Sequence, residues 1–213
     1  MSKLPDKIKT LVKESEFKLK EKGSVFISIS QPVNSVEIIE LILNSVKKKY
    51  HDATHYCYSY KIVDCSFKYS DSGEPSGTAG IRIYNAQNYF GLTNLLTIVV
   101  RYFGGTKLGV GPLGKAYYEA AFQNLQLSEL EEQILCDQIE IRYEYDQSKL
   151  IHHLISKFSL VIEKNLFETK PIIICSIPNT TIKKFSTDLK SLSNNQISSK
   201  LLNKPFYTKK QIL

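Results

Sequence analysis

The chain has 213 residues, of which 42% are hydrophobic and 23% charged. These fractions are typical of a globular protein and exclude a disordered chain. The N-terminal segment is charged at nearly every turn, and no later run approaches the roughly 18 apolar residues of a membrane-spanning helix. The four cysteines include no CxxC pair, which favours reduced thiols and excludes a zinc ribbon. We therefore expect a cytoplasmic protein with no membrane contact.

The net charge of +7 is unevenly distributed. Residues 1–133 hold 16 Lys and Arg against 14 Asp and Glu, whereas residues 134–213 hold 12 against 7. A basic surface attracts polyanions in a salt-sensitive way. The alternative is that these lysines are solvated and bind nothing in particular.

The first predicted elements follow a polar lead-in, residues 1–23, to which we assign no structure. Residues 24–30 alternate apolar and polar side chains, which predicts a half-buried strand. Apolar residues at helical spacing predict an amphipathic helix over 35–50, with Ser35 as its N-cap. Residues 53–70 have the pattern of a β-hairpin, which completes the first group of predicted elements.

Two unusual loops separate the next elements. Residues 70–80, SDSGEPSGTAG, are too rich in Gly, Ser, Asp and Pro to be anything but a structured loop. Residues 81–91 fit a short helix or an edge strand. Residues 92–103 form a continuous β-rich run of the kind that is buried on both faces. After a glycine-rich loop, a helix is predicted over 112–127, with Pro112 in its first turn.

An acidic connector, residues 128–133, is the candidate domain boundary. Beyond it the predicted order is strand, helix, strand, strand, helix and strand, over residues 134–145, 146–158, 160–169, 171–178, 179–192 and 196–202. This βαββαβ order is typical of a ferredoxin-like fold. We therefore expect an α+β protein with an N-terminal domain over 1–130, a ferredoxin-like domain over 134–204 and a tail over 205–213.

The glycine-rich loop between the predicted strand and helix suits an anion. Its glycines, which allow positive φ and outward N–H groups, are Gly104, Gly105, Gly109, Gly111 and Gly114. The helix start adds partial positive charge, and Arg101, Lys107 and Lys115 supply full charges nearby. The loop matches neither GxxxxGK[ST] nor a convincing dinucleotide fingerprint. The alternative is that the glycines only permit a tight turn.

The polar loop and the hairpin before it contain the remaining candidate residues. Asp71 and Glu74 are suited to hold a cation, although a magnesium site would need substrate phosphates to complete it. The alternative is that Asp71 only caps turns. His55 and Cys57 share one face of a predicted strand, as a metal site or a thiol nucleophile would require. No partner is spaced convincingly, and we expect neither a metal nor a cofactor.

Three stretches, DATHYCYSY at 52–60, SDSGEPSGTAG at 70–80 and VVRYFGGTKLGVGPLGKAY at 99–117, together resemble the IMPACT family and its bacterial YigZ-like branch. The resemblance covers about residues 15–128 strongly. It implies an N-terminal fold like the second domain of ribosomal protein S-five and a C-terminal fold like the last domain of elongation factor G. Eukaryotic relatives regulate translation under amino-acid starvation. The resemblance thus implies RNA or the ribosome as a partner.

The binding surface combines family positions with residues of the glycine-rich loop. It consists of His55, Asp71, Gly73, Glu74, Pro75, Gly77, Thr78, Arg101, Tyr102, Gly104, Gly105, Lys107, Leu108, Gly109, Gly111 and Lys115. One departure concerns the first predicted strand. The family usually has a basic residue between the serine and the phenylalanine of this strand, where the present chain has Val25 between Ser24 and Phe26.

Three functions remain open from the sequence. The first is an RNA-binding or ribosome-associated protein linked to regulation of translation, which contacts phosphates through the glycine-rich loop and the basic second part. The second is a hydrolase-type enzyme for a phosphorylated or peptide substrate, with His55, Asp71 and Glu74 beside the glycine-rich loop. The third is a module that binds a protein partner through the same surface.

Overall fold

A computed structural model describes residues 4–63, 67–167 and 169–209. The chain is a mixed α+β protein with two β-sheets, and it divides into two compact units. The first unit contains residues 8–131, and the second contains residues 4–7 and 132–213. Cys65, one of the four cysteines considered above, lies outside the described residues.

The first unit is built on a five-stranded antiparallel sheet in the order β2-β3-β6-β4-β5. Its strands are β2 (Ser15–Glu21), β3 (Ser24–Pro32), β4 (His55–Lys61), β5 (Phe67–Ser70) and β6 (Leu95–Tyr102). The β4–β5 hairpin and the buried strand β6 confirm the predictions. The polar lead-in, to which no structure was assigned, contains β2, in which Phe17 and Leu19 alternate with charged residues and which pairs antiparallel with β3.

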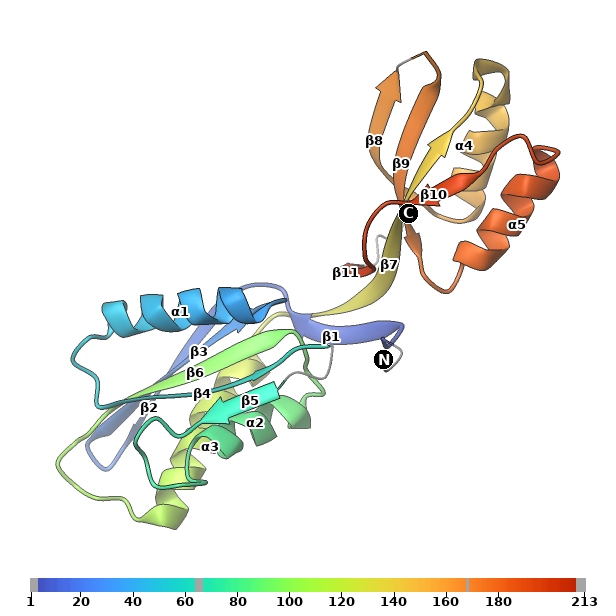
Figure 1. Ribbon diagram of the computed structural model, residues 1–213. Coiled ribbons are helices and arrows are strands. Elements are labelled where there is room, and N and C mark those ends of the chain that lie inside the picture. The colour runs from blue at the N-terminus through green and yellow to red at the C-terminus, as the bar shows by residue number, and fades with distance from the viewer. Residues whose placement is uncertain (1–3, 64–66, 168, 210–213) are drawn as a thin grey trace. The chain divides into compact units, whose positions relative to one another are not determined.

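Helices cover both faces of this sheet (Figure 1). Helix α1 (Val36–Lys49) lies on one face, and its first turn is capped by Ser35, whose Oγ accepts a hydrogen bond from the Ile38 N–H. Helices α2 (Gly80–Tyr89) and α3 (Val110–Leu127) lie on the other face. The segment predicted as a helix or an edge strand is therefore helical.

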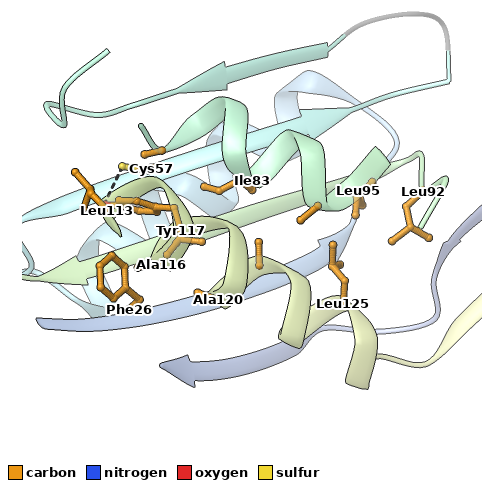
Figure 2. Packing of buried hydrophobic residues seen from close by; sticks show 14 of the residues in the cluster. Phe26, Cys57, Ile83, Leu92, Leu95, Leu113, Ala116, Tyr117, Ala120 and Leu125 are labelled. Carbon is orange, nitrogen blue, oxygen red and sulfur yellow. Dashed lines mark hydrogen bonds between the residues drawn. The ribbon is translucent and has the colours of Figure 1, made fainter. Parts of the chain in front are cut away.

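Side chains that alternate between the two faces of the sheet form two separate cores. The odd-numbered side chains of β6, such as Leu95 and Val99, face α2 and α3, where they pack with Tyr117 and Leu125 in one cluster (Figure 2). The even-numbered side chains, such as Ile98, pack towards α1 in a second cluster. Because β6 is buried on both faces, its sequence is continuously apolar.

The second unit follows the predicted order of elements. Its elements in chain order are β7 (Leu130–Arg142), a 3₁₀ turn (Tyr145–Gln147), α4 (Ser148–Lys157), β8 (Val161–Phe167), β9 (Pro171–Pro178), α5 (Ile182–Leu192) and β10 (Ser199–Leu201). Strand β7 pairs with β9 and β10, and β9 pairs with β8, all antiparallel. Apolar side chains of the sheet, α4 and α5 form one core.

Two further strands join β7. Strand β1 (Lys7–Leu11) neighbours β7 in the sheet, and β11 (Phe206–Lys209) pairs antiparallel with residues 133–136 of β7. The predicted tail thus contains a strand, and the predicted connector already includes the start of β7. The sequence pattern did not predict these segments. Backbone hydrogen bonds to a neighbouring strand are enough to pair them, and no run of apolar residues is required. Within the residues that the structure describes, no helix has both the length and the apolar character needed to cross a bilayer.

Candidate functional site

The polar loop between β5 and α2 is held together by the Asp71 carboxylate. Its Oδ1 accepts hydrogen bonds from the N–H groups of Ala79 and Gly80 at 2.9 and 2.8 Å, and its Oδ2 accepts one from Gly77 at 2.9 Å. The Thr78 hydroxyl donates to the Pro75 carbonyl at 2.6 Å. Asp71 therefore satisfies N–H groups at the start of a helix, in agreement with the capping alternative.

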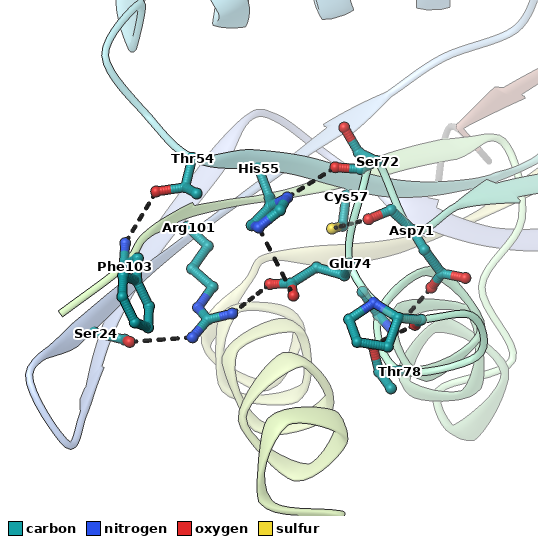
Figure 3. A network of polar contacts seen from close by, with 12 residues as sticks. Ser24, Thr54, His55, Cys57, Asp71, Ser72, Glu74, Thr78, Arg101 and Phe103 are labelled. Atoms are coloured by element: carbon teal, nitrogen blue, oxygen red, sulfur yellow. Dashed lines mark hydrogen bonds and ion pairs between the residues drawn. The ribbon is translucent and has the colours of Figure 1, made fainter. Parts of the chain in front are cut away.

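Glu74 and Arg101 form a buried ion pair beside this loop (Figure 3). Arg101 Nη1 lies 2.6 Å from Glu74 Oε1, and the two side chains are only 6% and 4% exposed. Arg101 Nη2 also donates to Ser24 Oγ at 3.3 Å. The guanidinium lies over the rings of Phe26 and Phe103, 5.4 and 5.6 Å from their centroids. Contrary to expectation, Arg101 is not a free charge for an anion, because Glu74 neutralises it.

Tyr117 extends this buried network into the core. The Tyr117 hydroxyl of α3 donates to Glu74 Oε1 at 2.8 Å, and Cys57 Sγ lies 3.3 Å from the same hydroxyl and 2.9 Å from the Asp71 carbonyl oxygen. Burial raises the pKa of the Cys57 thiol to about 12. The thiol therefore stays protonated near neutral pH and is no nucleophile.

His55 closes the network on the side of the polar loop. Its Nδ1 lies 2.9 Å from the Ser72 carbonyl oxygen, which only accepts hydrogen bonds, so Nδ1 carries the proton. Its Nε2 faces Glu74 Oε2 at 3.8 Å, beyond hydrogen-bonding distance. Gly73 packs against the imidazole, because a Cβ at this position would lie 3.3 Å from Nδ1. His55 thus fixes the loop to β4.

The base of the glycine-rich loop is anchored next to Arg101. The Gly104 N–H donates to Ser24 Oγ at 3.2 Å, and the Phe103 N–H donates to Thr54 Oγ1 at 3.1 Å. A Cβ at Gly104 would lie only 1.9 Å from the backbone carbon of Gly23. Close packing therefore explains this one glycine, in line with the tight-turn alternative.

The remainder of the loop is open and basic. Gly109 precedes α3 with φ of 81°, no side chain caps this helix start, and a Cβ at Gly111 would meet no described atom within 4 Å. Lys107 and Lys115 are exposed on either side of the helix start. Arg82 of α2 reaches the same end of α3, because a Cβ at Gly114 would lie 3.2 Å from its Nε. We call Arg82, Lys107 and Lys115 the basic group.

The members of the basic group are available to a ligand. All three side chains are exposed, and in the described part of the chain none of them takes part in an ion pair. The first N–H groups of a helix also have no partners within the helix. Full positive charges and a helix start thus meet at one surface, which is a suitable environment for an anion.

The structure divides the predicted binding residues into three sets. His55, Asp71, Gly73, Glu74 and Arg101 belong to the buried network and its loop, with Gly77 and Thr78 in the turn that Asp71 closes. Residues 104–115 form the base of the glycine-rich loop and the start of α3.

Tyr102 forms the third set. It lies on the α1 face of the sheet, where its hydroxyl donates to Asp52 Oδ1 at 2.9 Å. Val25 lies opposite Tyr102 on β3, so the departure from the usual basic residue is on this face and not beside Arg101.

Three contributing residues were missed by the sequence analysis. Tyr117 resembles any aromatic core residue of an amphipathic helix, and Ser24 resembles any polar residue at the start of a strand. Arg82 lies in the segment that fits both a helix and an edge strand, so its direction could not be assigned. A helical assignment of residues 80–89 is the signal that would have placed Arg82 beside the predicted helix start.

The carboxylates predicted for a hydrolase-type site have partners within the protein. Asp71 accepts three backbone hydrogen bonds, Glu74 is bound by Arg101 and Tyr117, and burial raises the pKa of the Cys57 thiol. Among the described residues, no group of three or more His, Cys, Asp or Glu side chains is placed to hold a metal ion. The two carboxylates proposed for hydrolysis are therefore engaged in contacts within the protein.

The chain is thus an α+β protein of two units with a basic surface at a glycine-rich helix start. The sequence profile of the Impact N-terminal domain matches residues 22–125, which include the buried network and the basic group. An IMPACT family member of Haemophilus influenzae is 31% identical over 85% of this chain and 90% of its own length. The IMPACT family member YigZ of Escherichia coli is 28% identical over 83% and 88%. The chain therefore belongs to the IMPACT family.

A solved structure has the same fold. The crystal structure of a hypothetical protein superimposes with a TM-score of 0.68 and covers 94% of this chain and 99% of its own. Its sequence is 24% identical. This similarity supports the arrangement of elements in both units.

Proposed function

We propose that the protein binds RNA, free or within the ribosome, and acts in the regulation of translation in the cytoplasm. The basic group is the observation that carries this proposal. Arg82 lies against Gly114 in the first turns of α3, Lys115 belongs to the same helix and Lys107 precedes it by three residues, and no described side chain caps this helix start. Backbone phosphates are the anions that such a sequence-independent site fits.

Family and fold support the same role. IMPACT relatives are associated with regulation of translation, and the first unit is proposed to share the fold of the second domain of ribosomal protein S-five. The βαββαβ unit is proposed to correspond to the last domain of elongation factor G. Its exposed lysines on α5, Lys183 and Lys184, extend the basic character of the chain. Both fold types recur in proteins that contact RNA, which is an argument by analogy.

The test is binding of fluorescent single-stranded and structured RNA over a salt series. The Arg82→Glu, Lys107→Glu, Lys115→Glu variant removes the basic group. Its control, Lys18→Glu, Lys20→Glu, Lys48→Glu, reverses three exposed lysines of β2 and α1. Each phosphate contact contributes about 0.7 to the slope of log affinity against log salt for single strands. We expect the first variant to lose about two units of slope and the control to keep the parent slope.

Arg101 is unsuitable for this test because its reversal would place two carboxylates together in the core. Absence of RNA binding at low salt would contradict the proposal. A nuclease-resistant pull-down of a protein would then support the protein-partner function instead. Equal slopes for the two variants would remove the basic group as the contact.

A further inference from the structure

Four aromatic side chains form a cluster on the outer side of α2 and α3. The Phe122 ring lies 5.1 Å from the rings of both Tyr89 and Phe90, and 5.6 Å from the ring of Tyr118, between centroids. Tyr89 and Phe90 are themselves 5.1 Å apart. We call these four residues the aromatic cluster. Neighbouring rings hold one another in place, so the cluster is a rigid surface feature.

The aromatic cluster is not part of the closed core. Phe90, Tyr118 and Phe122 are only partly buried and pack against the edge of the core that contains Leu95. Tyr89 is 69% exposed, although it is one of the larger side chains of the protein. Its ring meets those of Phe90 and Phe122 at interplanar angles of 80° and 60°, and because most of the side chain is exposed, the ring is available to a ligand.

The aromatic cluster lies in line with the basic group. Arg82 of α2 contacts the position of Gly114 in α3, and Tyr89 of α2 contacts Phe122 of α3. The two helices therefore run parallel, with the basic group at their N-terminal ends. Seven residues separate Arg82 from Tyr89, which is about 10 Å along a helix.

The charges along this surface differ from one end to the other. The basic group supplies exposed positive charge near the helix starts. Glu119, which accepts a hydrogen bond from Gln123 Nε2 at 2.7 Å, introduces negative charge one turn further along α3. Phosphates are therefore attracted to the basic group at the helix starts. Near Glu119 and the aromatic cluster, an uncharged, flat group fits better than a phosphate.

We propose that the outer surface of α2 and α3 binds single-stranded RNA, with a phosphate at the basic group and an unpaired base stacked on Tyr89 of the aromatic cluster. This inference rests on the proposed function and adds the form of RNA and the residues that distinguish it. Single strands expose the faces of their bases, whereas a duplex buries them in its own stack. Arginine and lysine beside aromatic side chains are the usual elements of such sites.

The absence of tryptophan from the chain provides a direct optical test. In a Tyr89→Trp variant the single tryptophan reports contact with a base, because stacking quenches its fluorescence. We expect quenching by oligouridylate and oligoadenylate, and none by a blunt RNA duplex of the same length. Adding Tyr145→Ala to the Tyr89→Trp variant of the full chain should leave this quenching unchanged.

Affinity measurements complete the test. Stacking on one aromatic side chain contributes about 1–3 kcal/mol, so Tyr89→Ala should weaken single-strand binding about 5- to 150-fold. Tyr145→Ala is the matched control, because Tyr145 is 62% exposed and lies in the second unit. The high exposure of both side chains leaves folding unaffected.

The outcomes separate this inference from the proposed function. RNA binding that is salt-sensitive but equal for duplex and single strand, and unchanged by Tyr89→Ala, would overturn the stacking surface and leave the proposed function standing. No binding of any RNA would overturn both. Quenching by single strands together with the loss in Tyr89→Ala would establish the surface.

Discussion

The buried network and the basic group lie on the same side of one sheet, and both include residues of the glycine-rich loop. They differ in that the charges of the network are buried and paired, whereas those of the basic group are exposed. In the network, Arg101 is paired with Glu74, and Tyr117 and Ser24 satisfy further groups. In the basic group, Arg82, Lys107 and Lys115 are exposed. A buried charge must find its partner within the protein, whereas an exposed charge can keep its interactions for a ligand.

The comparison assigns stability to one set of residues and binding to the other. The network joins β3, β4, β6, α3 and the polar loop, so it holds the base of the glycine-rich loop in place. The basic group and the aromatic cluster occupy the surface that this loop and α3 present. Variants of the network should therefore change stability, and variants of the basic group should change binding alone.

The largest expected effect comes from breaking the buried ion pair. Glu74→Gln leaves the Arg101 guanidinium buried without its counter-charge, which costs about 3–5 kcal/mol of the free energy of unfolding. Urea denaturation measures this loss. Lys13→Gln is the control, because Lys13 and Glu129 form an exposed pair at 3.3 Å whose removal changes stability by about 0–1 kcal/mol. Similar effects of both variants would contradict a structural role for the network.

The reactivity of Cys57 tests whether the network is closed to solvent. With a pKa raised from 9.0 to about 12 by burial, the thiolate fraction at pH 8 is about a thousandfold below that of an unperturbed thiol. We expect alkylation of Cys57 to be slower by at least this factor in the native protein than in urea, as measured by peptide mapping. Rapid native alkylation would show that the network opens readily.

The same pKa shift predicts a pH dependence of stability. The folded state keeps the Cys57 proton more tightly than the unfolded state, so this contribution is fully present below pH 9.0. It is lost progressively as the pH rises from 9.0 to about 12. A Cys57→Ser variant should show a shallower decline of the free energy of unfolding over this window. An unchanged decline would contradict the assignment.

Two glycines of the same loop provide a smaller and sharper contrast. Gly104→Ala forces a Cβ against the backbone of Gly23 and should cost about 1–3 kcal/mol or more. Gly111→Ala enters open space in the first turn of α3 and should stabilise by about 0.5–1 kcal/mol. Thermal unfolding compares the two. Equal losses would mean that the whole loop, and not only its base, is closely packed.

The smallest expected effect on stability belongs to the basic group. Arg82→Glu, Lys107→Glu, Lys115→Glu changes three exposed side chains, and surface substitutions usually alter the free energy of unfolding by about 0.5 kcal/mol or less each. The slope of log affinity against log salt in the RNA titration described above should nevertheless fall by about two units. A large loss of stability in this variant would remove the distinction between the two sets of residues.

Much of the fold was predictable because most elements have clear periodicity. The alternation of β3, the continuous apolar run of β6 and the helical spacing of α1 with its Ser35 cap each identify one element without reference to any other. The β-strands at residues 7–11, 15–21 and 206–209 were missed, because edge strands are short or charged and resemble loops. Residues 81–91 remained undecided because their apolar pattern fits both a helical and a strand period.

The candidate site was predictable as a set of residues but not as a set of roles. The residue types of two loops, the polar loop and the glycine-rich loop, were enough to predict a site of glycines, carboxylates and basic side chains near the start of the helix that is α3. That Arg101 is neutralised by Glu74 while Arg82 is exposed follows only from the folded chain, since the partners of Arg101 are Glu74, 27 positions away, and Ser24, 77 positions away. The sequence gives the chemical type of each side chain. Whether a charged side chain is buried and paired or exposed to a ligand depends on its neighbours in the folded protein.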